Sequence, residues 1–466
     1  MSTHYNKKMK SVLSVIVIPF VAMSMLSACG TSSENKSNNA SASASAGSQP
    51  TTADKAPAKE PVTITAWSND RSAMDVVTEQ VKQFNSANKD VQINYVVQSD
   101  DYAKVLTLAL QTNQAPDIFT RVGGIDYDKN KWVLPIEGLV DQKLISTLKP
   151  FTSGKSPDGK LYSLPTTAIT SRLIYNKDLF RSAGLDPEKP PVTFSEMKAA
   201  AKKITEAGKG ESYGIGIPLK YVGYVDWGID PLIAAGNGDL SSSTYNVKTG
   251  KFEMDKYKPA VEMVREIIKN KWAFPGASSL DNDPMRSAFA DGKIGMFVAQ
   301  TWDVGVLNDQ FKSKADWGVA ALPVPDGTVN SGGVASTGGS WSIWSGSKHP
   351  KEAAKVFEFF NGKQMSQVLQ KAGKIIALNP EAADPAYASN AKGSVGFLVK
   401  PTERSMMWPP SSFMEVKGKT YRETLTELFL TDKPIEPALQ QLNDIYNGAY
   451  DTALAAGKFK KEDYTR

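Results

Sequence analysis

The sequence predicts an α/β fold that is built as two domains or two interleaved lobes. Residues 61–119 follow the order strand, helix, strand, helix, strand, which is typical of a sheet with helices on both faces. Residues 173–360 contain a second series of predicted strands and helices. Removing a predicted leader of 28 residues from the 466 leaves 438, and a hydrophobic content of 41% allows this length to form two cores of ordinary size.

The N-terminus has the features of a secretory leader. Lysines precede an apolar run over residues 12–26, which is too short to span a bilayer comfortably. The run ends in Leu26-Ser27-Ala28-Cys29, which contains the only cysteine and resembles a bacterial lipobox. The resemblance implies cleavage before Cys29, lipidation of its thiol, and an extracytoplasmic protein that is lipid-anchored to the cell membrane. The alternative is an ordinary signal peptide with a chance cysteine.

Composition excludes several classes of function. Residues 29–60 consist mainly of small and polar residues, so we expect a disordered tether there. The formal charge of +5 includes three leader lysines, and the remaining +2 argues against a nucleic-acid partner. Once the leader is removed, His349 is the only histidine, so we expect no metal centre and no catalytic triad. We expect a monomer without a cofactor.

The first series of elements begins with a period of two. Val62, Ile64 and Ala66 alternate with threonines, which predicts a strand. Ser72 and Asp75 form a capping-box pattern before a helix. Ligands of such sheets bind at the carboxyl ends of strands, so the turns that follow strands hold candidate contacts. The predicted elements are strands at 62–66, 91–97 and 116–119 and helices at 74–84 and 102–109.

The second series extends to the C-terminus. Apolar runs predict buried strands, and apolar residues at helical spacing predict helices. Asn361 and Gly362 predict the end of one helix as a C-cap. The predicted strands are 173–175, 213–219, 294–298, 317–322 and 340–345. The predicted helices are 193–208, 257–268, 284–290, 350–360, 421–430 and 435–455.

Seven short stretches stand in a characteristic order along the chain. They are 63–67, 111–119, 162–165, 173–180, 288–296, 317–323 and 338–341. The most specific is the sequence Tyr-Asn-Lys-Asp-Leu-Phe at 175–180. Together they resemble the extracellular solute-binding lipoproteins of ABC sugar importers, of the maltodextrin- and oligosaccharide-binding type (bacterial solute-binding protein family 1).

The resemblance implies a two-lobed, type II periplasmic-binding-protein-like fold with hinged lobes around a central ligand cleft. The implied function is to capture a carbohydrate, expected to be an oligosaccharide, by lobe closure and to deliver it to a membrane permease. Such a protein is not an enzyme. Segments that cross between the lobes at 165–169 and 338–342 are expected to act as hinges. The expected N-terminal lobe is 61–166 plus 341–380, and the expected C-terminal lobe is 167–340 plus 381–466.

The resemblance also implies ligand contacts in the first lobe and at the first crossing. A sugar presents apolar C–H faces and a rim of hydroxyl groups, so its site needs aromatic planes and polar side chains. The turns after the first and third strands and the cleft floor are expected to supply them. The resembled maltodextrin binders have a glutamate near position 166, which this chain lacks, so their ligand is not carried over. The candidates are Trp67, Asn69, Asp70, Arg71, Arg121, Thr166 and Thr167.

The second lobe is expected to supply the stacking platforms. The family stacks sugar rings on an aromatic residue ahead of a helix and on another after a strand, and Trp227 and Trp302 hold these positions here. Asp303 is expected to bind a hydroxyl group. The second crossing and a late loop supply further contacts, and a glycine there would let a ring approach the backbone. These candidates are Gly339, Trp341 and Trp408.

Plainer explanations and other functions remain open. A candidate contact could instead cap a turn, form a surface salt bridge or pack in a core. The same fold could bind a polyamine in a carboxylate-rich cleft, or ferric iron through adjacent tyrosines and histidine. A secreted carbohydrate-active enzyme would need two placed carboxylates.

Overall fold

The computed structural model describes residues 60–466, apart from 99–100, 123–126, 152–155, 157, 222, 385 and 388–390. The predicted leader, Cys29 and nearly all of the predicted tether lie outside the described residues. In the ranges that are described, no helix combines the length and the apolar character needed to cross a membrane.

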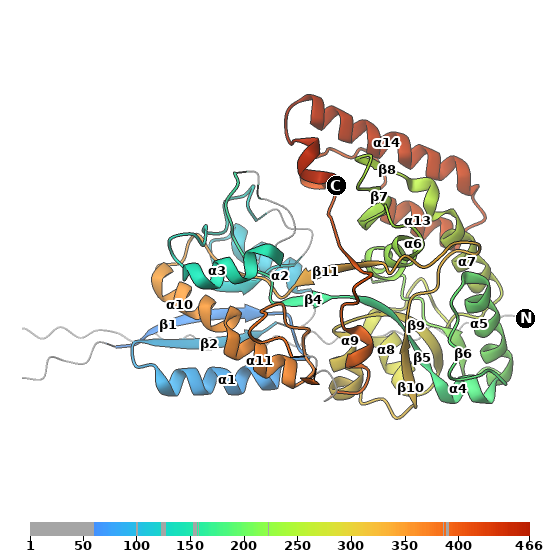
Figure 1. The fold of residues 1–466 in the computed structure, drawn as a ribbon, viewed down its shortest axis with the longest axis horizontal. Helices are drawn as coiled ribbons and strands as arrows, with labels where there is room; N and C mark the ends of the chain where they lie inside the picture. Colours follow the sequence, from blue (N-terminus) through green and yellow to red (C-terminus); the bar gives the residue numbers. More distant parts are fainter. Residues whose placement is uncertain are drawn as a thin grey trace, which may run out of the picture. The chain divides into compact units, whose positions relative to one another are not determined.

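The first sheet has the strand order β12-β3-β1-β2 (Figure 1). Its strands are β1 (Val62–Ser68), β2 (Val91–Val97), β3 (Ile118–Thr120) and β12 (Trp341–Ile343). β1 pairs in parallel with β2 and β3, whereas β12 is antiparallel to β3. The chain therefore leaves this sheet after β3 and returns to it only at β12.

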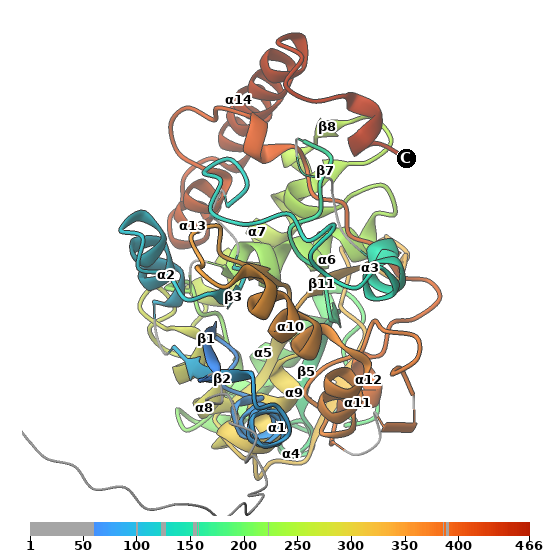
Figure 2. The same ribbon diagram turned by 90° about the vertical axis from the view of Figure 1, so that its left-hand side faces the viewer.

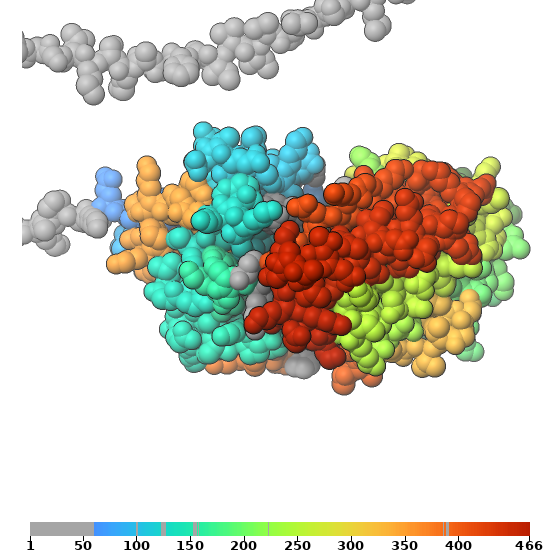
Figure 3. All heavy atoms as spheres, turned by 90° about the horizontal axis from the view of Figure 1, so that it is seen from above, coloured from blue at the N-terminus to red at the C-terminus, as the bar shows by residue number. Residues whose placement is uncertain are grey.

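Helices cover both faces of the first sheet. Ile118 and Phe119 are neighbours in β3 and belong to hydrophobic cores on opposite faces. In Figure 3, residues from about 350 to 370 lie beside the first described residues, drawn in blue. In Figure 2, which faces this side of the molecule, α1, α10 and α11 lie in front. We call this part the N-lobe. Its helices are α1 (Met74–Ala87), α2 (Tyr102–Gln111), α3 (Gln142–Leu148), α10 (Pro350–Asn361) and α11 (Lys363–Lys371).

The second sheet has the order β10-β5-β9-β6. β5 is antiparallel to β9 and β10, and β6 is parallel to β9. All residues of β5 are buried, as expected for a strand inside a sheet that is covered on both faces. We call the part around this sheet the C-lobe. Its strands are β5 (Ser171–Asn176), β6 (Tyr213–Ile215), β9 (Ile294–Gln300) and β10 (Trp317–Ala320).

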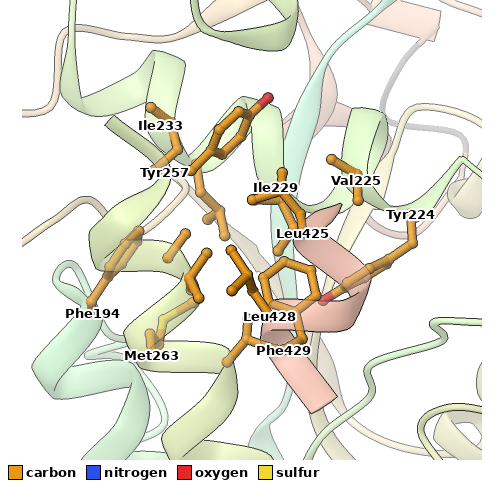
Figure 4. Close-up of a cluster of buried hydrophobic side chains, with 14 of the residues drawn as sticks. Phe194, Tyr224, Val225, Ile229, Ile233, Tyr257, Met263, Leu425, Leu428 and Phe429 are labelled. Atoms are coloured by element: carbon orange, nitrogen blue, oxygen red, sulfur yellow. The ribbon is translucent and has the colours of Figure 1, made fainter. Parts of the chain in front are cut away.

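The C-lobe contains most of the helices. Figure 4 shows Leu425, Leu428 and Phe429 packed with Val225 and Ile229 in its core. The α-helices are α4 (Lys177–Ser182), α5 (Phe194–Gly208), α6 (Asp230–Gly236), α7 (Lys258–Lys269), α8 (Asn282–Ala290), α9 (Asp303–Gly305), α12 (Ser394–Phe397), α13 (Tyr421–Leu430) and α14 (Ile435–Ala455). Two π-helices, η2 (Val225–Ile229) and η5 (Val306–Gln310), and a hairpin of β7 (Tyr245–Asn246) and β8 (Lys251–Phe252) complete this lobe. Short 3₁₀ turns are η1 (Lys149–Phe151), η3 (Ser242–Thr244), η4 (Met254–Tyr257), η7 (Ser411–Phe413) and η8 (Lys461–Tyr464).

Three segments lie side by side between the lobes. β4 (Thr167–Ile169) pairs antiparallel with β11 (Val334–Gly338), which also pairs with β13 (Arg404–Ser405). The third segment joins β4 from the other side, because Ala168 N donates to Ile376 O at 2.8 Å and Leu378 N donates to Thr166 O at 3.1 Å. Backbone hydrogen bonds therefore connect every segment at which the chain changes lobes.

Local details of the sequence prediction need correction. The Ser72–Asp75 capping box is wrong: α1 begins after Ala73, and Asp70 accepts the backbone N–H groups of Ser72 and Ala73 instead, at 3.0 and 3.2 Å. Gly362 does end α10, but its φ of −74° is extended rather than left-handed, because α11 begins directly after it. The strand predicted at 213–219 ends at Ile215.

A buried ion pair connects β5 to a distant loop of the C-lobe. Arg172 binds Glu403 through two hydrogen bonds, at 2.5 and 3.1 Å, and their side chains are only 4% and 1% exposed. The same guanidinium donates to the carbonyl oxygens of Gly396 and Leu398. Because every nitrogen has an acceptor, this arginine fixes residues 396–403 against the second sheet.

Removing only the acidic partner is expected to be costly. Glu403→Ala should lower the free energy of unfolding by about 3–5 kcal/mol, because it leaves a buried guanidinium charge without its counter-ion. The double variant Arg172→Met/Glu403→Leu should lose less than Glu403→Ala, since it removes both charges and keeps the volume. Denaturant unfolding measures both. A double variant that loses as much stability as Glu403→Ala, or more, would contradict this account.

Candidate functional site

Two predicted platform residues lie against each other in the C-lobe. Trp302 follows β9, and Trp227 lies within the π-helix η2. Their rings are 5.2 Å apart and meet edge to face at 80°, and both side chains are partly exposed. Gln300, the last residue of β9, donates from Nε2 to Trp227 O at 2.6 Å. The carboxyl end of β9 therefore holds both indoles in one place, which we call the tryptophan pair.

A buried carboxylate fixes the turn that carries Trp302. Asp303 Oδ2 accepts the backbone N–H of Gln300 at 2.7 Å, and Oδ1 lies 2.6 Å from Arg286 Nη2. The Asp303 side chain is 2% exposed. Asp303 is a predicted contact for a ligand hydroxyl group, and the structure places its side chain out of solvent with both oxygens facing groups of the protein.

Two aspartate side chains, one within the π-helix that carries Trp227 and one directly after it, hold this helix in place. Asp226 accepts from Arg422 Nε at 2.8 and 2.9 Å and from the Tyr421 hydroxyl, so it ties η2 to the start of α13. Asp230 accepts the hydroxyl of Tyr257 and the backbone N–H of a residue in η3. Single π-helical turns are strained and recur at functional sites. Here the clamps hold such a turn where it presents an indole.

The N-lobe turn after β1 organises itself through short hydrogen bonds. Asn69 N donates to Thr120 Oγ1 at 3.3 Å, and that hydroxyl donates to Asn69 Oδ1 at 3.0 Å, so the carboxyl ends of β1 and β3 are joined. Asp70 caps the following backbone N–H groups, as described above. Trp67 is partly buried against the core on the α2 face. Asn69 thus stays exposed at the sheet edge where ligands of this fold class bind.

Arg71 contacts the C-lobe directly. Its Nη2 lies 2.5 Å from Asp283 Oδ2, at the start of α8. Close by, Gly305 packs against the next residue of the N-lobe turn: a Cβ at Gly305 would lie 3.3 Å from Ser72 Cβ. The turn after β1 and the turn that carries Trp302 are therefore neighbours, and the predicted ligand-binding guanidinium of Arg71 is engaged by protein.

The crossing residues predicted at the cleft floor serve the crossing itself. Thr166 is buried, and its hydroxyl donates to Gly339 O at 3.1 Å. Thr167 Oγ1 accepts the N–H of Ile376 at 3.1 Å. Gly339 has φ +69°, and a Cβ there would lie 2.2 Å from Thr166 Oγ1. The close approach that requires this glycine is therefore made by a threonine, not by a ligand ring.

Trp341 does not belong to the exposed site. It is buried in the N-lobe core, where its ring stacks on Phe360 at 4.2 Å and 18°. Trp341 is a predicted ligand contact, and β12 returns it to the first sheet with its side chain against α10.

Arg121 and Trp408 lie at the margins. Arg121 pairs with Asp128 at 3.1 Å and lies over the Tyr127 ring at 4.7 Å, so it stabilises its own loop. Trp408 is 38% exposed on a loop that hydrogen-bonds to Ala335 of β11 and so stands near the crossing.

The charged groups beside the tryptophan pair are balanced by partners. Burial raises the pKa of Asp303, and the Arg286 guanidinium opposes this shift. Burial also acts to raise the pKa of Asp283, but Arg286 and Arg71 outweigh it and hold that pKa below its usual range. A small cavity of about 120 Å³ lies elsewhere in the C-lobe, beside the Arg172–Glu403 pair, and Lys400 also lines it. We therefore place the candidate site at the tryptophan pair.

Sequence reasoning missed the residues that support the pair. Gln300 lies two residues after the predicted strand 294–298, so the strand-end rule could have indicated it. Arg286 lies on the predicted helix 284–290 and Asp283 directly precedes that helix, and their spacing of three residues allows one shared ion pair. No sequence pattern connects Arg422 with Asp226, which lies nearly two hundred residues earlier.

A family comparison identifies the class of protein. The model of the bacterial extracellular solute-binding protein family matches residues 67–366. The chain belongs to this family. It is thus an extracellular solute-binding protein, the solute-binding component of an ABC transporter, and not an enzyme. The match contains the tryptophan pair, the second sheet and the first sheet apart from the first five residues of β1.

Relatives and solved structures agree with this membership. A binding protein of Brucella abortus (strain 2308) is 30% identical over 67% of this chain and 75% of its own length. The sn-glycerol-3-phosphate-binding periplasmic protein UgpB of Agrobacterium fabrum is 24% identical over 82% of this chain and 85% of its own.

Two solved structures show the same fold. RafE of Streptococcus pneumoniae in complex with raffinose has a TM-score of 0.62 at 19% identity, covering 83% of this chain and 99% of RafE. The Thermus thermophilus maltotriose-binding protein has a TM-score of 0.62 at 21% identity, covering 83% and 100%. The predicted periplasmic-binding-protein-like fold is confirmed.

The clamp at Asp230 should make stability depend on pH. Burial, and next the charge of Asp226, raise the pKa of Asp230 to about 8. The folded state therefore holds this proton more tightly than the unfolded state, whose carboxyl titrates near pH ~4. The stabilisation is complete below that pH and is lost as pH rises towards about 8.

Asp230→Asn cannot titrate and serves as the reference. The free energy of unfolding of the wild type minus that of Asp230→Asn should fall with pH by up to about 1.4 kcal/mol per unit over this window. Denaturant melts at a series of pH values measure the difference. A difference that stays constant across the series would contradict the buried, protonated carboxyl.

Proposed function

We propose that this solute-binding protein captures an oligosaccharide between its lobes and delivers it to a membrane permease. The observation that carries the proposal is the tryptophan pair, in which two partly exposed indoles stand edge to face at the carboxyl end of β9. Aromatic planes bind the apolar C–H faces of sugar rings. Two planes at a steep angle suit a ligand with more than one ring.

The surroundings of the pair favour an uncharged ligand. Both nearby carboxylates, Asp283 and Asp303, are paired with arginines, so they do not form the acidic cleft that a polyamine requires. The iron alternative requires adjacent tyrosines, and the sequence has no Tyr-Tyr pair. Asn69 on the N-lobe turn can donate to and accept from hydroxyl groups.

Lobe closure is proposed to bury the ligand. The proposed lobes are residues 61–166 plus 341–380 and residues 167–340 plus 381–466, with the crossings at 165–169 and 338–342 as hinges. The three hydrogen-bonded crossing segments allow rotation at strand ends while keeping the two sheets connected. The first ligands to test are those of the similar proteins: raffinose, maltotriose and, from UgpB, sn-glycerol 3-phosphate.

Calorimetric titration tests the ligand class. Raffinose, maltotriose, sn-glycerol 3-phosphate and spermidine are titrated into the protein without its leader. We expect an oligosaccharide to bind, and Trp302→Ala to weaken its affinity about tenfold through the loss of one stacking platform. Trp302→Phe should keep most of the affinity, because it keeps a plane.

A matched control lies at the other end of the same sheet. Trp272 O accepts Gly214 N in β6, whose partner residues begin β9, whereas the tryptophan pair lies at the end of β9. Trp272→Phe should therefore leave the affinity unchanged. Binding of spermidine or glycerol phosphate in place of every sugar would overturn the proposed ligand class while leaving the family membership intact.

We also propose that Cys29 anchors the protein to the cell membrane. The support is the Leu-Ser-Ala-Cys sequence at the end of a secretory leader, followed by a polar stretch. Cys29→Ser should move the protein from the membrane fraction to the medium or the soluble extracytoplasmic fraction, which immunoblotting of fractionated cells measures. Wild-type protein that is already soluble would refute the anchor.

A further inference from the structure

We propose that Asp283 and Arg286 are positioning residues that connect the contact between the lobes to the geometry of the tryptophan pair. The inference rests on the proposed function only in taking the tryptophan pair as the ligand site. Neither residue belongs to the pair, and both lie on α8 of the C-lobe. They form the middle of an unbroken chain of polar contacts that starts in the N-lobe.

The polar contacts that link Arg71 to Trp227 can be followed atom by atom. Arg71 Nη2 of the N-lobe lies 2.5 Å from Asp283 Oδ2, and Asp283 Oδ1 accepts from Arg286 Nη1 at 3.0 Å. Arg286 Nη2 lies 2.6 Å from Asp303 Oδ1. Asp303 then accepts the backbone N–H of Gln300, whose side chain binds the carbonyl of Trp227.

Burial increases steadily along this chain. The exposed fraction of the side chain falls from 42% at Arg71 to 28% at Asp283, 9% at Arg286 and 2% at Asp303. An interaction that starts as a weak surface ion pair thus continues into a region where unpaired charge is expensive. Changes at the exposed end are therefore felt at the buried end.

Charge balance gives the N-lobe contact its effect. With both carboxylates ionised, Asp283, Arg286 and Asp303 together carry one negative charge, and Arg71 neutralises it. When Arg71 withdraws, Asp283 loses one cation and attracts the other more strongly. Arg286 is shared between the two carboxylates, so its pull on Asp303 weakens and the turn that carries Trp302 loosens.

A second ion pair across the lobes provides a matched control. Lys374, which follows α11 of the N-lobe, lies 2.5 Å from Asp309 in η5. It also flanks Gly305, since a Cβ there would lie 3.8 Å from Lys374 Cδ. This pair links the lobes at the same face, but it is not one of the contacts that connect Arg71 to Asp303 and Gln300. Lys374→Gln therefore perturbs the contact between the lobes but leaves the polar contacts from Arg71 to Trp227 in place.

The pair itself supplies a readout that needs no ligand. Two indoles at this distance and angle couple their electronic transitions and give a paired positive and negative band in the far-ultraviolet circular dichroism spectrum. Trp227→Phe removes the coupling and identifies the band. Arg71→Gln should reduce its amplitude to a value between those of the wild type and Trp227→Phe, whereas Lys374→Gln should leave it unchanged. Asp283→Asn leaves Arg286 to Asp303 alone, so it should keep the wild-type band, also when Arg71→Gln is added.

Two outcomes overturn the inference. One is an unchanged band in Arg71→Gln, with a melting temperature that shows folded protein. The other is an equal loss in Lys374→Gln, which would mean that lobe contact in general, and not this chain, sets the geometry. Because no ligand is added, a failed sugar proposal leaves this test intact.

Once a sugar that binds has been found, its affinity for the variants gives a second test of this inference. Arg71→Gln should weaken binding about two- to fivefold, the factor expected for an exposed ion pair. Adding Arg71→Gln to Asp283→Asn should cause no further loss, because Arg71 acts through Asp283. Losses that multiply would show independent roles and contradict the chain.

Discussion

The hydrogen-bonded crossing of β4, β11 and the segment at 376–378 is the constraint on which the rest of the structure depends. It makes three distant parts of the chain neighbours and fixes where each sheet begins and ends. The buried Thr166 hydroxyl and the glycine at position 339 are required for this close approach, so residues that a sugar-binding family would lend to the ligand serve the backbone here. The candidate site that we propose lies at the strand ends on either side of the crossing.

At those strand ends the two lobes make different contributions. The C-lobe supplies indole planes on a π-helix and on the turn after β9, both held by buried or half-buried carboxylates. The N-lobe supplies a short polar turn whose arginine reaches across to α8. The aromatic surface therefore lies within the C-lobe alone. The N-lobe adds polar groups to it, and its arginine neutralises a negative charge on α8 when the lobes are in contact. Ligand binding and lobe contact then strengthen each other by the same factor.

Local periodicity explains how much of the fold could be predicted. The helices at 421–430 and 435–455 and the strand at 91–97 match the structure because their patterns lie within one element. Trp227 and Trp302 could be placed near a site because the resemblance implies stacking aromatic residues at these two positions. Asp303 and Trp341 could not be judged from the sequence, since their burial depends on Arg286 and Phe360, which only the tertiary structure brings near.

The most direct test of the central claim is an experimental structure of the protein without its leader, determined with whichever of raffinose or maltotriose binds. This account predicts a sugar ring in van der Waals contact with Trp227 or Trp302, polar contacts from the turn after β1, and an intact Arg71–Asp283 ion pair. A sugar bound at another position, with both indoles bare, would contradict it.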